Sequence, residues 1–267
     1  MSAIQVKSHA KINLALNITG KLAKLHKIES IVSFINLHDL IFIKQIKEPN
    51  HRIYFYGNFS QKISKNNTVE KLFKILDEKK LLKDKKFQIK IKKNIPQKAG
   101  LGGGSMNAAS ILKILLKKKI IKASQKKIKD ISNAIGSDVI LGVDNKSAVL
   151  KSDNIIKRFS KCPKFYTLLV RPNFGCSTKE IYSRVKKITK SKFTNPKRSM
   201  FKYGYLFKQA NALETVAFSR YPRLKKIKSF LENLNQPLFV RMTGSGSVLV
   251  AYYQSKKDCE LAKVQFK

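Results

Sequence analysis

The chain has 267 residues, of which 43% are hydrophobic, and it carries a formal net charge of +40 at neutral pH. This length and composition predict a folded protein of two modest domains. No run of about 18 apolar residues is present, so we expect no membrane-spanning helix. The first residues do not have the pattern of a secretory signal, which favours a cytoplasmic protein.

The first part of the chain predicts two strands and a helix. Residues 2–18 and 28–45 have the β-branched residues and partial alternation of strands. Residues 66–78 predict a helix that begins at Asn67, with Glu70 three positions later at capping-box spacing. The apolar residues of this helix share one face: Val69, Leu72, Phe73 and Leu76.

A further strand, a glycine-rich segment and two helices follow. Residues 85–96 alternate apolar side chains and end near Pro96, as expected of a half-buried strand. The glycine-rich segment 99–110 leads into a helix, and Ser124 begins the next helix, which continues into "IGSDVI" at 135–140. Residues 146–151 predict a short strand.

The second half of the chain predicts more strands and helices. Residues 165–172 form an apolar strand, and a helix begins at Ser177 with Glu180 at capping-box spacing. The remaining segments are a lysine-rich loop near 187–200, helices over 203–219 and 222–233, strands over 237–242 and 246–253, and a last helix from about 255. The sequence therefore predicts an α+β fold with domains 1–153 and 154–267.

The high positive charge allows two interpretations. Clustered basic charge is typical of nucleic-acid binding. The alternative is a lysine-rich surface without a specific polyanion partner, which we favour because the lysines are spread along the chain and only eight residues are arginine. The three cysteines, Cys162, Cys176 and Cys259, are scattered, so we expect neither disulfides nor a cysteine metal site.

The segment "AGLGGGSMNAAS" at 99–110 has more glycine than a turn before a helix requires. Bare backbone at a helix N-terminus lets N–H groups approach an anion closely, and the helix dipole favours negative charge there. One or two glycines would suffice for a tight turn without a ligand, so we favour a phosphate-binding loop. The segment matches neither a Walker A loop nor a dinucleotide-binding fingerprint.

The glycine segment, "PQKAGLGGGSMNAA" in full, resembles the ATP loop of the GHMP kinases. The form GLGGGS-x-NAA is typical of one branch, the 4-diphosphocytidyl-2-C-methyl-D-erythritol kinases. Four further segments resemble motifs of that branch: "AKINLALNITGKLAKLHKIES", "IGSDVI", "NALETVAFSRYP" and "MTGSGSVLVA". The resemblance implies an N-terminal domain like domain 2 of ribosomal protein S5, a ferredoxin-like C-terminal domain, and transfer of the ATP γ-phosphoryl group to the 2-hydroxyl of the cytidyl substrate. ATP and Mg²⁺ are the implied cofactors, and a monomer or homodimer without a membrane or specific nucleic-acid partner is the implied state.

Two residues are the candidates for catalysis. Asp138 can serve as a proton acceptor, or it can be an Asx-turn or cap residue. Lys11 is one of many lysines, and on a strand it would share a face with Asn13. The resemblance implies that Lys11 lies beside Asp138 and the substrate hydroxyl, where a cation favours the ionised carboxylate and the developing alkoxide.

The resemblance also implies two binding groups. The implied ATP-binding residues are Pro96, Gly100, Leu101, Gly102, Gly103, Gly104, Ser105 and Asn107. The implied substrate-binding residues are Asn13, His26, Thr178, Tyr182, Gly244 and Gly246. His26 would hold the cytosine ring and Tyr182 would stack on it, whereas Ser177 and Thr178 either approach the substrate phosphates or cap a helix.

Four positions depart from the family pattern. Leu25 replaces a tyrosine that would stack on the base, Met106 replaces a serine, Ile140 replaces a proline, and Lys98 replaces a small residue. Lys98 would either add charge near the phosphates or face water. Two alternative functions stay open at this point: another GHMP kinase of mevalonate type, and a basic RNA-binding protein.

Overall fold

The computed structural model describes residues 3–22 and 25–266, and its main-chain contacts divide the chain into two units. Unit 1 comprises the start of the chain up to Lys11, with residues 34–97 and 102–145. Unit 2 comprises residues 12–33, 98–101 and 146–267. The long strands β1 (Ile4–Leu22) and β2 (Leu25–Ile46) each contribute residues to both units.

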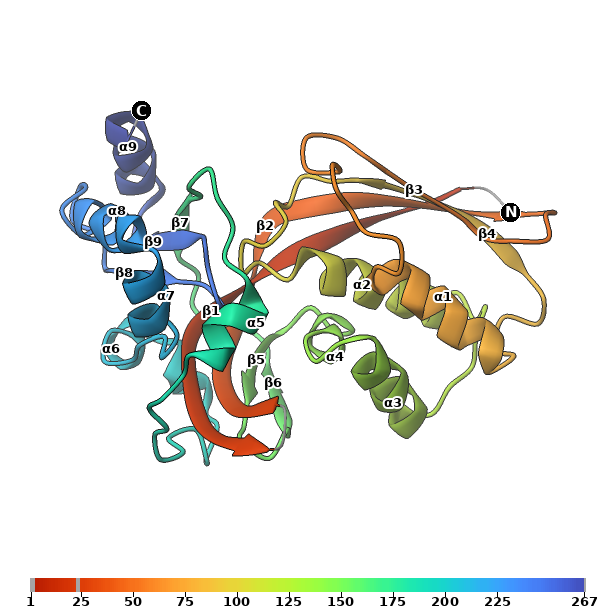
Figure 1. Ribbon diagram of the computed structural model, residues 1–267, viewed down its shortest axis with the longest axis horizontal. Helices are drawn as coiled ribbons and strands as arrows, with labels where there is room; N and C mark the ends of the chain where they lie inside the picture. Colours follow the sequence, from red (N-terminus) through yellow and green to blue (C-terminus); the bar gives the residue numbers. More distant parts are fainter. Residues whose placement is uncertain (1–2, 23–24, 267) are drawn as a thin grey trace. The chain divides into compact units, whose positions relative to one another are not determined.

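Unit 1 is a sheet with helices on one face (Figure 1). Its further strands are β3 (Arg52–Tyr56) and β4 (Lys86–Lys92). β4 pairs antiparallel with β2, from Leu40 opposite Lys92 to Ile46 opposite Lys86, and parallel with β3. Its helices are α1 (Thr68–Glu78), α2 (Gly103–Lys117), α3 (Gln125–Ile135) and α4 (Val139–Gly142).

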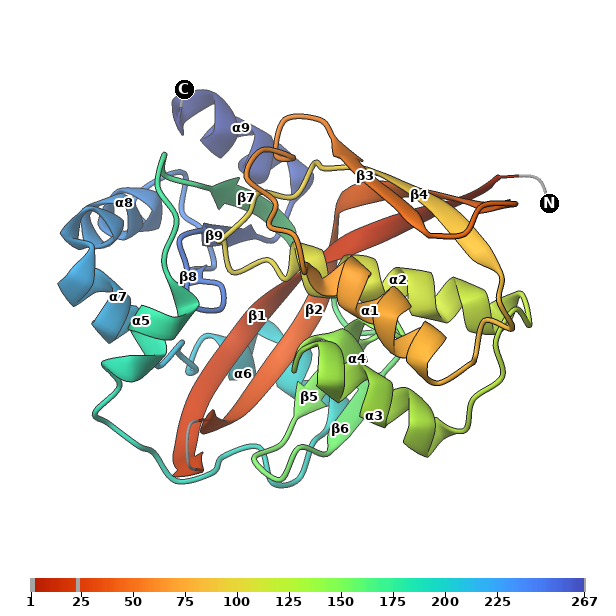
Figure 2. The same ribbon diagram turned by 45° about the vertical axis from the view of Figure 1, so that its right-hand side comes forward.

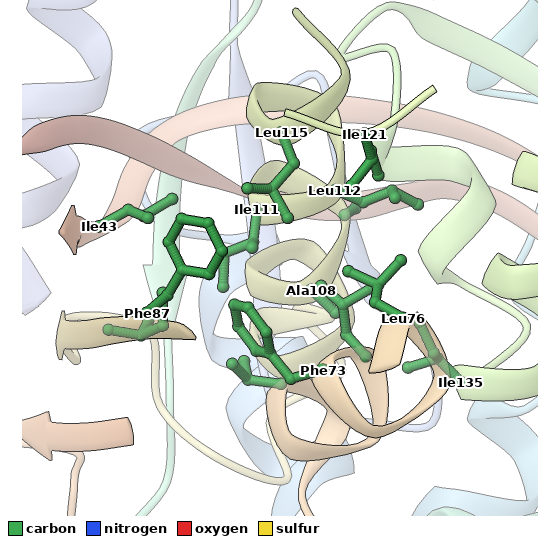
Figure 3. Packing of buried hydrophobic residues seen from close by; sticks show 14 of the residues in the cluster. Ile43, Phe73, Leu76, Phe87, Ala108, Ile111, Leu112, Leu115, Ile121 and Ile135 are labelled. Atoms are coloured by element: carbon green, nitrogen blue, oxygen red, sulfur yellow. The ribbon is translucent and has the colours of Figure 1, made fainter. Parts of the chain in front are cut away.

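The core of unit 1 forms where the helices meet the alternating apolar residues of the strands. Figure 3 shows Ile43 and Phe87 from the sheet beside Phe73 of α1 and Ile111 of α2. Each such large side chain contributes roughly 1.5–3 kcal/mol when it is fully buried. This packing fixes α2, and therefore the glycine segment at its start, against the sheet.

Unit 2 contains the remaining strands and helices (Figure 2). In this unit β2 pairs with β5 (Ser147–Leu150), which pairs with β6 (Ile156–Phe159). A second, antiparallel sheet has the order β7 (Tyr166–Val170), β9 (Leu249–Tyr253), β8 (Phe239–Met242). The helices are α5 (Thr178–Ser183), the 3₁₀ helix η1 (Arg198–Phe201), α6 (Tyr203–Leu206), α7 (Glu214–Arg220), α8 (Pro222–Glu232) and α9 (Lys256–Phe266).

The predicted α+β class is confirmed, although some details of the prediction are wrong and the short strands β3 and β6 were not predicted. The predicted helix over 203–219 is two helices, α6 and α7, because Asn211 interrupts the segment between them. Its Nδ2 donates to the carbonyls of Met242 and Gly244 at 2.7 and 2.8 Å, and its Oδ1 accepts from Leu213 N. Such side-chain bonds to the main chain compete with helix formation.

In both predicted capping boxes the N-cap side chain accepts the expected bond, but the glutamate three residues later does not bond back to the N-cap N–H. Asn67 does cap α1, accepting from Val69 N and Glu70 N, but Glu70 accepts from Asn66 N instead of the N-cap. In α5 the cap Ser177 accepts from Glu180 N at 3.3 Å, while the Glu180 carboxylate binds Arg220 at 2.6 Å. A guanidinium attracts a carboxylate more strongly than a neutral N–H does.

Candidate active site

Lys11 and Asp138 form an ion pair in unit 1. Lys11 Nζ lies 3.2 Å from Asp138 Oδ2, and the Lys11 side chain is 6% exposed whereas that of Asp138 is 32% exposed. Among the described residues, two lysines are buried, Lys11 and Lys93. Burying an ammonium group is costly unless an opposite charge compensates it. The Asp138 carboxylate compensates the charge of Lys11, whereas an exposed lysine needs no such partner.

The contacts of Asp138 bear on its two interpretations, proton acceptor and cap residue. Asp138 occupies the N-cap position of α4, but its side chain makes no capping hydrogen bond there. Its carboxylate instead faces Lys11 and remains partly exposed. This geometry supports a proton acceptor rather than a helix cap.

The N-cap of α2 lies directly against Lys11. Gly102 has a φ of +68°, and a Cβ added to it would lie 2.9 Å from Lys11 Cγ. Nearby, a Cβ on Gly136 would lie 3.9 Å from Ser105 Oγ. The start of α2, the segment before Asp138 and Lys11 of β1 therefore meet in one place.

The first turn of α2 has the features of an anion site. Its leading N–H groups have no partner inside the helix, and the helix dipole is positive there. A Cβ on Gly103 would lie 3.0 Å from Ile95 Cγ2, and one on Gly104 would lie 3.1 Å from Thr68 Oγ1. Bare glycines therefore let this turn pack closely on its neighbours while its N–H groups stay available for phosphates.

The other predicted ATP-binding residues precede this turn in the sequence or lie within α2. Pro96 and Leu101 are buried, and Gly100 has a φ of +75°. Asn107 is buried in α2, and its Oδ1 has no hydrogen-bond partner within the described chain. Such an atom is costly to leave unsatisfied, which fits a polar ligand or water at this helix.

In unit 2, His26 and Tyr182 lie together. Their ring centroids are 5.4 Å apart and the planes are inclined by 43°. This places the predicted base-binding histidine beside the predicted aromatic residue. The side chain of Leu25 lies outside the described residues.

The other predicted substrate residues of unit 2 form a hydrogen-bonded group. Asn13 N donates to Thr243 Oγ1 at 3.0 Å, and Asn13 Nδ2 donates to Ser30 Oγ at 2.8 Å. Thr178 Oγ1 lies 2.9 Å from Ser245 Oγ. Ser245 is the residue between the buried Gly244 and Gly246. Ser177 caps α5, whereas Thr178 contacts the final glycine loop.

Two of the departures from the family pattern, Met106 and Ile140, pack in unit 1. Met106 is 1% exposed, and a Cβ added to Gly142 would lie 2.8 Å from its Sδ, so Met106 fills space between α2 and α4. Ile140 packs against the core of unit 1. Lys98 is exposed, and its carbonyl accepts from Cys176 N at 3.3 Å.

Sequence reasoning missed several residues that hold these loops. Thr68 Oγ1 donates to the carbonyl of Gly104 at 2.7 Å, and Thr243 Oγ1 donates to the carbonyl of Gly100 at 3.1 Å. Asn211 holds the final glycine loop through its two carbonyl contacts. Thr243 and Asn211 lie in segments that resemble family motifs, and Thr68 lies in the predicted helix over 66–78, but none of the three was named as a contact residue.

No helix within the described ranges is both long and apolar enough to span a membrane. Among the same residues, no group of three or more His, Cys, Asp or Glu side chains could hold a metal ion.

Comparison with known proteins identifies the family. The family described as "GHMP kinases N terminal domain" matches residues 67–151. A 4-diphosphocytidyl-2-C-methyl-D-erythritol kinase of Pelagibacter ubique is 55% identical over the whole chain and 95% of its own length. The corresponding kinase of Anaplasma marginale is 31% identical over 95% of this chain and 89% of its own.

Solved structures show the same fold at lower identity. A crystal structure of 4-(cytidine 5'-diphospho)-2C-methyl-D-erythritol kinase has a TM-score of 0.78 at 20% identity, covering 98% of this chain and 94% of its own. Homoserine kinase from Cytophaga hutchinsonii has a TM-score of 0.68 at 13% identity, covering 100% of this chain and 91% of its own. With 55% identity along its whole length to the first of these relatives, the chain belongs to the 4-diphosphocytidyl-2-C-methyl-D-erythritol kinases of the GHMP kinase superfamily.

Proposed function

We propose that this chain transfers the γ-phosphoryl group of ATP to the 2-hydroxyl of 4-diphosphocytidyl-2-C-methyl-D-erythritol, a reaction of the non-mevalonate route to isoprenoids. The observation that carries the proposal is the pairing of buried Lys11 with partly exposed Asp138 beside the N-cap of α2. The name and identity of the relative from Pelagibacter ubique support the substrate.

In this reaction Asp138 accepts the proton of the substrate hydroxyl as the hydroxyl oxygen bonds to the γ-phosphorus of ATP and the bond from that phosphorus to the bridging oxygen breaks, which releases ADP. Lys11, 3.2 Å from the Asp138 carboxylate, orients that carboxylate and stabilises negative charge that develops on the attacking oxygen. The N–H groups of the first turn of α2, with Ser105 and Asn107, hold the nucleotide phosphates. A Mg²⁺ ion that accompanies the nucleotide would supply neutralisation of the phosphate charge.

We also propose which residues bind the cytidyl substrate. His26 and Tyr182 hold the cytosine ring, and their ring contact supports this assignment. Asn13, Thr178, Gly244 and Gly246 are assigned to the remainder of the substrate. The domain division 1–153 and 154–267, the cytoplasmic location, the monomer or homodimer, and the absence of a membrane or specific nucleic-acid partner stay predictions.

An ATP-consumption assay tests the substrate. The cytidyl substrate, its precursor without the cytidyl group, and mevalonate are compared under identical conditions. We expect turnover with the cytidyl substrate and little with the other two. Comparable turnover of mevalonate would favour a mevalonate-type kinase and contradict the proposal.

The variant Asp138→Asn tests the catalytic role. We expect kcat to fall by about 10²–10⁴, the usual contribution of general base assistance, while the Kd of ADP changes little. Asp153→Asn is a suitable control, since Asp153 is an exposed carboxylate that also pairs with a lysine, at 3.0 Å. A near-normal kcat for Asp138→Asn would mean that this residue is structural.

A further inference from the structure

An ion pair with both charges buried lies beneath the first turn of α2. Lys93 directly follows β4 and is 3% exposed, and Asp39 of β2 is fully buried. Lys93 Nζ donates to Asp39 Oδ2. Apolar residues of similar volume often fill such a place with equal or greater stability, so stability alone does not explain a buried ion pair.

Asp39 fixes the main chain that leads to the glycine segment. Its Oδ1 accepts from Asn94 N at 2.7 Å and from Ile95 N at 2.8 Å. The carboxylate therefore holds three consecutive residues, 93–95, immediately before Pro96. Through Ile95 this anchoring extends to α2, because a Cβ on Gly103 would lie 3.0 Å from Ile95 Cγ2.

The ammonium group of Lys93 lies against the first residue of α2. A Cβ on Gly103 would lie 3.4 Å from Lys93 Nζ. A cation at this end of a helix is repelled by the positive end of the helix dipole. Burial also lowers the pKa of Lys93 below its usual value, although Asp39 opposes the shift. An anion bound at the first turn of α2 would offset the repulsion, so the arrangement suits a helix end that receives phosphates.

We propose that Lys93, held by Asp39, is a positioning residue for the nucleotide phosphates. It packs against the first turn of α2 at Gly103 and adds a buried positive charge to that helix end. This inference rests on the proposed function, which assigns the same turn to ATP. Because Lys93 acts on bound nucleotide in the ground state and the transition state alike, its loss should raise the KM for ATP and leave kcat nearly unchanged.

The double variant Asp39→Asn with Lys93→Met tests the proposal. It leaves no unpaired buried charge, and the amide oxygen at position 39 can still accept from Asn94 N and Ile95 N. We expect the Kd of ADP, measured by calorimetry, and the KM for ATP to rise about ten-fold, equivalent to roughly 1.4 kcal/mol. The KM for the cytidyl substrate and kcat should stay within about two-fold of wild type.

A second variant and a control complete the design. Lys93→Gln keeps a hydrogen-bond donor for Asp39 but removes the positive charge. It is measured in place of the double variant if that variant does not fold, and we expect the same rise in its Kd for ADP. Lys86→Met removes a partly exposed pair with Asp77, 3.0 Å apart, at the other end of β4 and should leave the Kd of ADP unchanged.

The outcomes separate this inference from the proposed function. A folded Lys93 variant that binds ADP with the wild-type Kd would overturn the positioning role. An equal loss of ADP affinity in Lys86→Met would also overturn the positioning role, because loss of any ion pair in unit 1 would then weaken ADP binding. Wild-type protein that neither binds ADP nor consumes ATP would instead contradict the proposed function.

Discussion

Replacing Gly102 by alanine should displace the Lys11 side chain while leaving its ammonium group in the protein. Gly102 is the N-cap of α2 with a φ of +68°, a region that costs an L-residue about 1–2 kcal/mol. The added Cβ would lie 2.9 Å from Lys11 Cγ and 3.1 Å from Lys11 Cε. Lys11 is 5% exposed, so its stem has little space in which to move.

Two effects follow from this geometry. The backbone cost should lower the melting temperature by about 2–8 °C, since each kcal/mol shifts it by about 2–4 °C in domains of 150–250 residues. The clash should displace the Lys11 ammonium from its position 3.2 Å from Asp138. A misplacement of about 1 Å at a reacting centre can cost about 100-fold, so kcat should fall by about that factor.

Thermal unfolding and steady-state kinetics measure these effects on the same preparation. Gly204→Ala is the matched control, because its added Cβ would meet no atom within 4 Å other than those of its chain neighbours and the helix backbone, and Gly204 lies inside α6. That substitution should stabilise the protein by roughly 0.5–1 kcal/mol with an unchanged kcat. If Gly102→Ala loses stability and keeps a normal kcat, the close contact between Gly102 and Lys11 does not set the catalytic geometry.

Two further substitutions test packing and titration in unit 1. Met106→Ser should destabilise the protein by about 2–5 kcal/mol, because it leaves a cavity beside Gly142 and buries a hydroxyl; denaturant unfolding measures this loss, and a change below 1 kcal/mol would contradict the packing role. Burial lowers the pKa of His51 from its usual 6.5, although Asp77 opposes the shift. The unfolded chain therefore takes up a proton below about pH 6.5 that the folded protein resists, so the free energy of unfolding should fall as pH drops through that range. Denaturant unfolding from pH 8 to 5 should show this slope in wild type and a flatter one in His51→Gln; equal slopes would show that His51 does not control it.

Local features of the sequence predicted the helices that have their own start signals. Asn67, Ser124 and Ser177 each cap a helix as predicted, since a cap depends on a side chain and N–H groups two or three residues away. The partners of Glu70 and Glu180 were predicted wrongly, because a nearby N–H in one case and a distant arginine in the other competed for each carboxylate.

Features that depend on distant contacts could not be predicted. β3 was not predicted: it has five residues, of which Tyr54 and Tyr56 are 45% and 42% exposed, and it pairs with β4 along its whole length. The Asp39–Lys93 pair has no local signal either, because its members are 54 positions apart. The resemblance to a family supplied Lys11 and Asp138 as candidates, but the burial of Lys11 is visible only in the fold.

The glycines of the 99–110 segment have different physical causes, which changes the inference drawn from their number. A Cβ on Gly100 would lie 1.9 Å from the carbonyl oxygen of Thr243, so packing within unit 2 already requires glycine there. Gly102 is required by its positive φ and by Lys11, within unit 1. Neither requirement involves a ligand. The inference of a phosphate site therefore depends less on the count of glycines than on the place of Gly103 and Gly104 in the first turn of α2, where the N–H groups have no partner inside the helix.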